Sequence, residues 1–85
     1  MEKAGFRVYP NQASNYIVLD CSFPLTKAAE WRLSDALGRV VKSQALAPNT
    51  ERQSMLIENL ANGIFFWKVQ SDGEIIGSGK VIVIR

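Results

Sequence analysis

The side chains of this chain that could do chemistry are eight carboxylates, one cysteine and two tryptophans, and no histidine is present. Without histidine, the chain cannot form a Ser-His-Asp or Cys-His nucleophile or a histidine-ligated zinc site. Cys21 has no second cysteine to pair with, so an intrachain disulfide is excluded and a small buried side chain is its expected role. We therefore expect no catalytic residue, no metal site and no cofactor.

The carboxylates do not suggest an acid–base pair. Glycosidase chemistry needs two carboxyl groups that face one cleft about 5–9.5 Å apart, and the spacing supplies no such pair. Most carboxylates fall in predicted turns or on outer strand faces, where they favour solubility and discourage pairing between sheet edges. These residues are Asp20, Glu30, Asp35, Glu58, Asp72 and Glu74. The sequence predicts that the protein is not an enzyme.

The aromatic residues allow two interpretations. Trp31 and Trp67, with Tyr9 and Tyr16, could form a platform that stacks on sugar rings or bases. Alternatively, both tryptophans belong to the core, which is favoured because charged residues such as Arg32 and Lys68 alternate with them. Their exposure distinguishes the two interpretations.

Charge and length narrow the class of protein further. The chain has 85 residues, of which 47% are hydrophobic, as expected for one folded domain. Its ten basic and eight acidic residues give a net charge of +2 with no block of either sign, so nucleic acid is not an expected partner. No apolar run exceeds four residues, so neither a transmembrane segment nor a signal peptide is predicted.

The elements that must position these residues are strands, because no stretch keeps a helical apolar period. Short segments with β-type patterns recur between turn signals, which is typical of an immunoglobulin-like sandwich of about seven antiparallel strands in two sheets. A small barrel is the alternative. We expect residues 6–85 to form this single domain and residues 1–5 to be a flexible remnant of a linker or cloning sequence. The predicted strands are Phe6–Tyr9, Tyr16–Ser22, Glu30–Ser34, Arg39–Leu46, Arg52–Ile57, Ile64–Ser71 and Glu74–Arg85.

Local signals mark the ends and bends of these strands. The segments Asp35–Gly38 and Asp72-Gly73 predict tight hairpin turns, since Asp can bond its own backbone and Gly accepts positive φ. Pro24 is expected to end the second strand. Gly77 and Gly79 are expected to bend or bulge the last strand.

The C-terminal segment, Gly79–Arg85, is apolar on both faces. Either Ile82 and Ile84 or Val81 and Val83 should project outward, in a stripe bracketed by Lys80 and Arg85. If this strand lies at a sheet edge, its free backbone groups could accept a partner strand or support a dimer. The alternative is that the domain's own sheets, or a dimer, cover both faces.

Four blocks, in order along the chain, resemble the C-terminal sorting domain of the Bacteroidetes type IX (Por) secretion system. Together they cover essentially residues 6–85. The departures are Gln12, where the family has proline, Phe65, where it has tyrosine, and Trp67, where a smaller aliphatic residue is common. The blocks are Tyr9-Pro10-Asn11-Gln12-Ala13-Ser14-Asn15-Tyr16, the turn block Leu33–Val41 with Asp35, Gly38 and Arg39, the block Leu60–Val69 with Gly63, and the terminal Gly79-Lys80-Val81-Ile82-Val83-Ile84-Arg85.

The resemblance implies a non-enzymatic domain at the end of a cargo protein. Its terminal residues, Gly79–Arg85, would be recognised by outer-membrane secretion machinery, while Tyr9–Asn11, the Asp35–Arg39 turn and Gly63 would hold the sandwich. It further implies passage through the periplasm and the outer membrane to the cell surface or the medium, often with removal of the domain by a sortase-like protease. The alternative function is an accessory module that binds carbohydrate or a cell-surface partner through Trp31 and Trp67.

Overall fold

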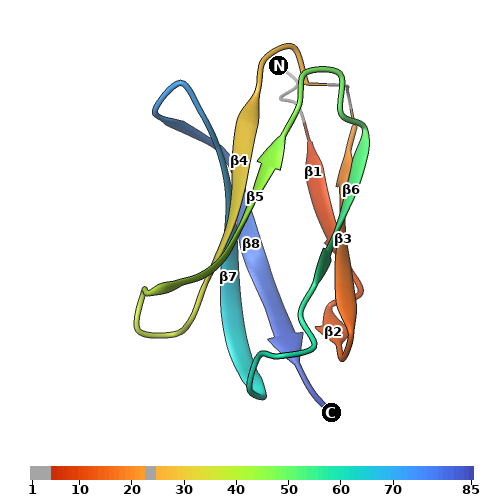
Figure 1. Ribbon diagram of the computed structural model, residues 1–85, viewed down its shortest axis with the longest axis vertical. Helices are drawn as coiled ribbons and strands as arrows, with labels where there is room; N and C mark the ends of the chain where they lie inside the picture. Colours follow the sequence, from red (N-terminus) through yellow and green to blue (C-terminus); the bar gives the residue numbers. More distant parts are fainter. Residues whose placement is uncertain (1–4, 23–24) are drawn as a thin grey trace.

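The computed structural model describes residues 5–22 and 25–85, in which the regular elements are all β-strands arranged in two facing sheets (Figure 1). One sheet has the order β1-β3-β6 and the other the order β2-β8-β7-β4-β5. The seven predicted strands are all present, with ends that differ by at most two residues, which confirms the all-β sandwich. The strands are β1 (Phe6–Tyr9), β2 (Gln12–Ala13), β3 (Tyr16–Cys21), β4 (Ala29–Ser34), β5 (Val40–Leu46), β6 (Arg52–Leu56), β7 (Gly63–Ser71) and β8 (Glu74–Val83).

Two expectations fall largely outside the described residues. Pro24 lies there, and so does most of the N-terminal segment 1–5, so its flexibility stays a prediction. Gly5 is described: its carbonyl accepts a hydrogen bond from the Ser22 N–H at 2.8 Å.

The eighth strand, β2, was not predicted, and it is parallel to its neighbour. β1 pairs antiparallel with β3, whereas Gln12 and Ala13 pair parallel with Ile82 and Val83 of β8. The cis peptide bond Tyr9–Pro10 lies between β1 and β2. β1 and β8 run in the same direction (Figure 1). The chain crosses from β1 to the edge of β8 without reversing, so β2 pairs with β8 in parallel. The seven predicted strands pair antiparallel with one another, and among the described strands the additional β2 makes the one parallel pair.

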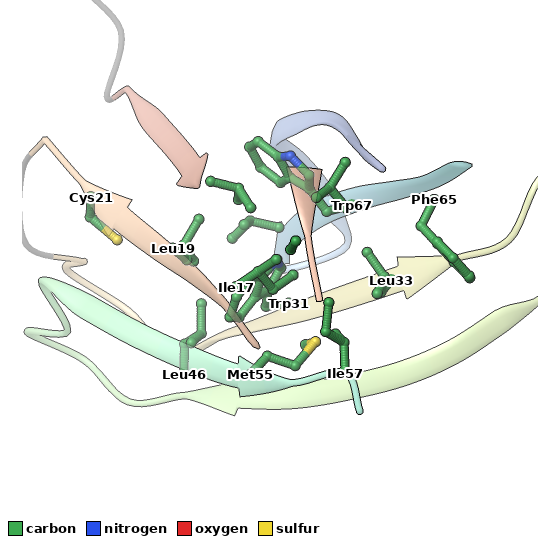
Figure 2. Packing of buried hydrophobic residues seen from close by; sticks show 14 of the residues in the cluster. Ile17, Leu19, Cys21, Trp31, Leu33, Leu46, Met55, Ile57, Phe65 and Trp67 are labelled. Carbon is green, nitrogen blue, oxygen red and sulfur yellow. The ribbon is translucent and has the colours of Figure 1, made fainter. Parts of the chain in front are cut away.

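The core fills the space between the sheets, where alternate side chains of the strands converge (Figure 2). Both tryptophans belong to it, since Trp31 is 0% exposed and Trp67 is 5% exposed. The core interpretation of these residues is confirmed. The other buried hydrophobic residues are Val8, Ala13, Ile17, Leu19, Cys21, Leu25, Leu33, Leu46, Met55, Ile57, Phe65, Val69, Val81 and Val83.

The two glycines of β8 make room for aromatic rings. A Cβ atom on Gly79 would lie 2.6 Å from Nε1 of Trp67, its cross-strand partner, and one on Gly77 would lie 2.5 Å from Cδ2 of Phe6. The register shift of the β7–β8 pair falls at Ile76, beside Gly77. No register shift falls at Gly79, so the expectation of a bulge is wrong there; the missing side chain of Gly79 lets the indole pack on the strand.

The two hairpin turns have the geometry that their sequences predict. Gly38 has φ 88°, and the β7–β8 turn has φ 53° at Asp72 and 77° at Gly73. Positive φ at both central residues is typical of a type I′ turn, whose twist matches that of the flanking strands.

Candidate functional site

The terminal strand divides its apolar residues between two faces. Val81 and Val83 point into the core and are 1% and 0% exposed. Ile82 is half-buried on the opposite face, and Ile84, just after β8, is 49% exposed. Of the two alternatives that the sequence left open, the structure therefore selects Ile82 and Ile84 as the outward pair.

The edge of this part of β8 is not free, because β2 covers it. The Ile82 N–H donates to the Asn11 carbonyl and the Ile84 N–H donates to the Ala13 carbonyl, both at 2.9 Å. Of the two alternatives that the sequence left open, an open edge is therefore excluded from Ile82 to Ile84, where the domain's own β2 occupies it. The crossover after Pro10 brings the backbone that occupies this edge.

The surface that remains is the outer face of β7 and β8. On it, Ile64 lies directly opposite Ile82, and Phe66 lies directly opposite Lys80. The side chains of Ile64 and Phe66 are 45% and 42% exposed. We call Ile64, Phe66, Lys68, Lys80 and Ile82 the outer β7–β8 face. Contiguous exposed apolar side chains beside charged ones are typical of interaction surfaces.

A hollow of about 610 Å³ lies at the Lys68 and Lys80 end of this face. The β4–β5 turn borders it and projects on the side away from the three-stranded sheet (Figure 1). The hollow is open to solvent rather than enclosed. Its lining residues are Ser34, Asp35, Ala36, Gly38, Phe66, Trp67, Lys68, Ser78, Gly79 and Lys80.

Asp35 organises the turn that borders the hollow. Its Oδ1 atom accepts hydrogen bonds from the backbone N–H groups of Leu37 and Arg39, both at 3.0 Å, and its Oδ2 atom accepts one from the Arg39 guanidinium at 2.8 Å. The Arg39 backbone N–H, with these other donors, holds the pKa of the Asp35 carboxyl below its usual value. The structure thus brings Asp35, Gly38 and Arg39 together in one turn.

The remaining motif residues lie near the ends of β1 and β7. Tyr9 is half-buried, with the Arg7 guanidinium 5.3 Å from its ring centroid, and Pro10 is exposed. The Asn11 carbonyl holds Ile82, as described above. Gly63 pairs with Val83 in the β7–β8 register. The Tyr9–Asn11 motif and Gly63 therefore flank the terminal strand from two sides.

Arg85 has a contact that the sequence did not suggest. Its guanidinium donates hydrogen bonds to the backbone carbonyls of Ile57 and Leu60, in the connection between β6 and β7. These bonds tie the end of the chain to the rest of the domain. Arg85 is thereby drawn away from the outer β7–β8 face.

Three residues of this face, Ile64, Phe66 and Lys68, were not predicted from the sequence. They lie on β7, one strand away from the terminal motif, and only the register of β7 with β8 brings them beside Lys80 and Ile82. Their alternation with the buried Phe65 and Trp67 is the one local signal that could have placed them on the outer face.

The tryptophans and Cys21, the other candidate functional residues, are buried. Because Trp31 and Trp67 are buried, neither can serve as the binding platform of the alternative function. Burial, with a smaller contribution from the Asp20 carboxylate, raises the pKa of the Cys21 thiol and disfavours the nucleophilic thiolate. Over residues 5–22 and 25–85, no three possible metal ligands lie together, and no helix has the length and apolar character of a membrane span.

These features define a class of protein: a small two-sheet β domain that presents an outer strand face. Comparison with protein families then identifies the domain more closely, since the model of the secretion system C-terminal sorting domain matches residues 7–84. The chain belongs to this family of type IX sorting domains, which confirms the resemblance of the four sequence blocks. A search of curated proteins gives no match.

Family membership establishes the function at a coarse level. The domain is a C-terminal sorting signal for type IX secretion, so it interacts with the secretion machinery. The precursor that carries it is secreted or displayed on the cell surface.

Proposed function

We propose that the domain acts without enzymatic activity to direct an upstream cargo across the outer membrane, and that the machinery recognises Gly79–Arg85 through its outward side chains. One observation carries this proposal: Ile82 and Ile84 face outward beside Lys80, on a strand whose adjacent edge is already paired. Contact with a partner is therefore made through a strand face. Backbone pairing with an incoming strand plays no part at this position.

The inner residues of the same segment supply the support for this contact. Val81 and Val83 anchor the strand in the core, β2 holds its edge, and Arg85 binds the preceding connection. A ligand surface on a rigid element loses little conformational entropy when it binds. Folding of the sandwich is thus the step that orders the signal for display.

We also propose the export route of the precursor, from the family to which the domain belongs. The precursor passes through the periplasm to outer-membrane secretion machinery, and a sortase-like protease removes the domain from its cargo. A dimer through an edge strand would use an end strand such as β5, and not the last residues of β8, because β2 covers them.

Point substitutions in a reporter fusion test the recognition of the terminal segment. Deleting Lys80–Arg85 should leave cargo in the periplasm of a type IX-competent host, but it also removes the buried Val81 and Val83. The double variant Ile82→Ser/Ile84→Ser changes the outward side chains alone. We expect it to abolish secretion while circular dichroism shows a folded domain.

A matched control lies on the other sheet. Tyr16 and Leu56 are an opposed, exposed pair on β3 and β6, with exposures of 53% and 63%. Tyr16→Ser/Leu56→Ser should leave secretion unchanged. Normal secretion of the Ile82/Ile84 variant, or equal loss in the control, would falsify recognition through the terminal segment.

A further inference from the structure

Three cations gather on the outer surface of the five-stranded sheet. Arg32 of β4 lies directly opposite Lys68 of β7, and Lys68 lies opposite Ser78, which places Lys80 at the diagonal position on β8. Opposed side chains in an antiparallel pair have Cβ atoms about 4.5–5.5 Å apart, and diagonal neighbours are about 7–8 Å apart. Like charges directly opposite each other, as Arg32 and Lys68 are, destabilise a sheet.

Among the described residues, one of these three cations, Arg32, has a carboxylate partner. Arg32 forms an ion pair with Glu30 at 2.8 Å, and the Ser43 hydroxyl holds the other oxygen of that carboxylate. Neither Lys68 nor Lys80 forms an ion pair within residues 5–22 and 25–85. Both side chains are exposed, so their ammonium groups can contact an anion from outside the domain.

Both lysines line the hollow that the β4–β5 turn borders. Lys68 and Lys80 line it together with the hydroxyl-bearing Ser34 and Ser78 and the exposed ring of Phe66. Its one carboxylate, that of Asp35, already accepts hydrogen bonds from Arg39 and from the turn backbone. The hollow thus combines positive charge, neutral donors and an aromatic surface.

We propose that this hollow binds an acidic segment of a partner protein, with a carboxylate held between Lys68 and Lys80 and apolar side chains packed on Phe66 and Ile82. The inference rests on the proposed function, since β8 carries both, and it adds the chemistry of the partner. Side chains two residues apart on an extended segment are about 6.6 Å apart, which matches the spacing of Lys80 and Ile82 along β8.

A protein segment fits this surface better than a small anion does. Apolar side chains continue from Phe66 to Ile64 and Ile82, beyond the cationic end of the face. An inorganic or sugar-borne anion would cover the lysines and leave these side chains in water. Because the lysines are exposed, salt weakens the charged part of the contact and leaves the apolar part.

The test uses the 85-residue chain labelled with ¹⁵N and a synthetic eight-residue peptide that alternates glutamate with leucine. A peptide with glutamine in place of glutamate is its control. We expect the acidic peptide, and not its control, to change the chemical shifts of backbone amides around Lys68 and Lys80. Lys68→Gln/Lys80→Gln should weaken binding about tenfold, since one exposed ion pair accounts for about two- to fivefold.

A second double variant removes the same net charge elsewhere. Lys27→Gln/Lys42→Gln changes one lysine that pairs with Asp72 and one that lies opposite the inward-facing Leu33. This control should bind the acidic peptide within about twofold of the unmodified chain, because exposed charges far from a contact are screened.

Several results would overturn the proposal. Equal binding of the two peptides, or equal weakening in the two double variants, would show that the lysine pair is not a carboxylate site. Tighter binding of inorganic phosphate, or of vesicles of phosphatidylglycerol, would assign the hollow to a small anion or to a membrane. Each of these results leaves the secretion test of Ile82 and Ile84 unaffected, so the two ideas fail separately.

Discussion

The inner and outer faces of the β7–β8 hairpin differ sharply, although one pair of strands supplies both. On the inner face, Phe65, Trp67 and Val69 are buried, and the glycines opposite Trp67 and Val69 carry no side chain. On the outer face, Ile64 and Phe66 are exposed beside Lys68 and Lys80, which form no ion pair with any residue that the structure describes. Because strand side chains alternate, each residue belongs to one face, so substitutions can separate stability from recognition.

The outer surface of the three-stranded sheet provides a second contrast. There, Oδ2 of Asp20 lies 3.3 Å from Nη2 of Arg7, and Oδ1 lies 3.8 Å from Nε of Arg52. These two guanidinium groups therefore have an acidic partner within the domain. The corresponding groups of the outer β7–β8 face have none among the described residues. This difference favours the outer β7–β8 face of the five-stranded sheet as the surface that binds a partner.

The largest effect on stability is expected from Trp67→Ala on the inner face. Removing a buried aromatic side chain costs about 3–5 kcal/mol of unfolding free energy, because contacts are lost and a cavity remains. Urea unfolding should show this loss, whereas Phe66→Ala on the outer face should cost far less. Equal losses would break the distinction between the two faces.

Gly79→Ala should have the next largest effect. The added Cβ would lie 2.6 Å from the Trp67 indole, and overpacking of this kind costs about 1–3 kcal/mol. If contact with the indole causes this loss of stability, Gly79→Ala should cost less in a Trp67→Leu background. A double-mutant cycle of unfolding free energies measures this difference. Strict additivity would contradict this assignment.

Asp35→Asn should lower the melting temperature at neutral pH by a smaller amount. The pKa of the Asp35 carboxyl is lowered in the folded state, so its stabilising effect is present above the unfolded pKa of about 3.9 and is lost as pH falls through the folded value. Thermal unfolding from pH 7 to pH 2 should therefore show the variant and the unmodified chain converging. A difference that is constant with pH would contradict this.

The smallest stability change is expected for Ile64→Thr on the outer face. The side chain is 45% exposed and threonine suits a strand, so the unfolding free energy should change by only about 0.5 kcal/mol. Secretion of a reporter fusion should nevertheless decrease, because this side chain adjoins Ile82. A stable variant with normal secretion would exclude Ile64 from the recognition surface.

The sequence alone determined seven of the eight described strands, the two hairpin turns and the family. Alternating side chains and turns such as Asp35–Gly38 and Asp72-Gly73 are local features, set by backbone conformation within a few residues. The burial of the tryptophans followed from the same alternation, since Trp31 lies between Glu30 and Arg32 and Lys68 follows Trp67. The sorting function was inferred from the resemblance of the four blocks to a known family. Strand periodicity and turn residues do not indicate this function by themselves.

Only the tertiary structure decided how the terminal strand is used. A run such as Val81–Ile84 has apolar residues at every position, so it carries no alternation to say which pair faces the core. The pairing of β2 with β8 rests on two residues and has no local pattern. Likewise, the packing of Trp67 on Gly79 and the approach of Lys68 to Lys80 depend on the register between strands, which contacts across the whole sheet select.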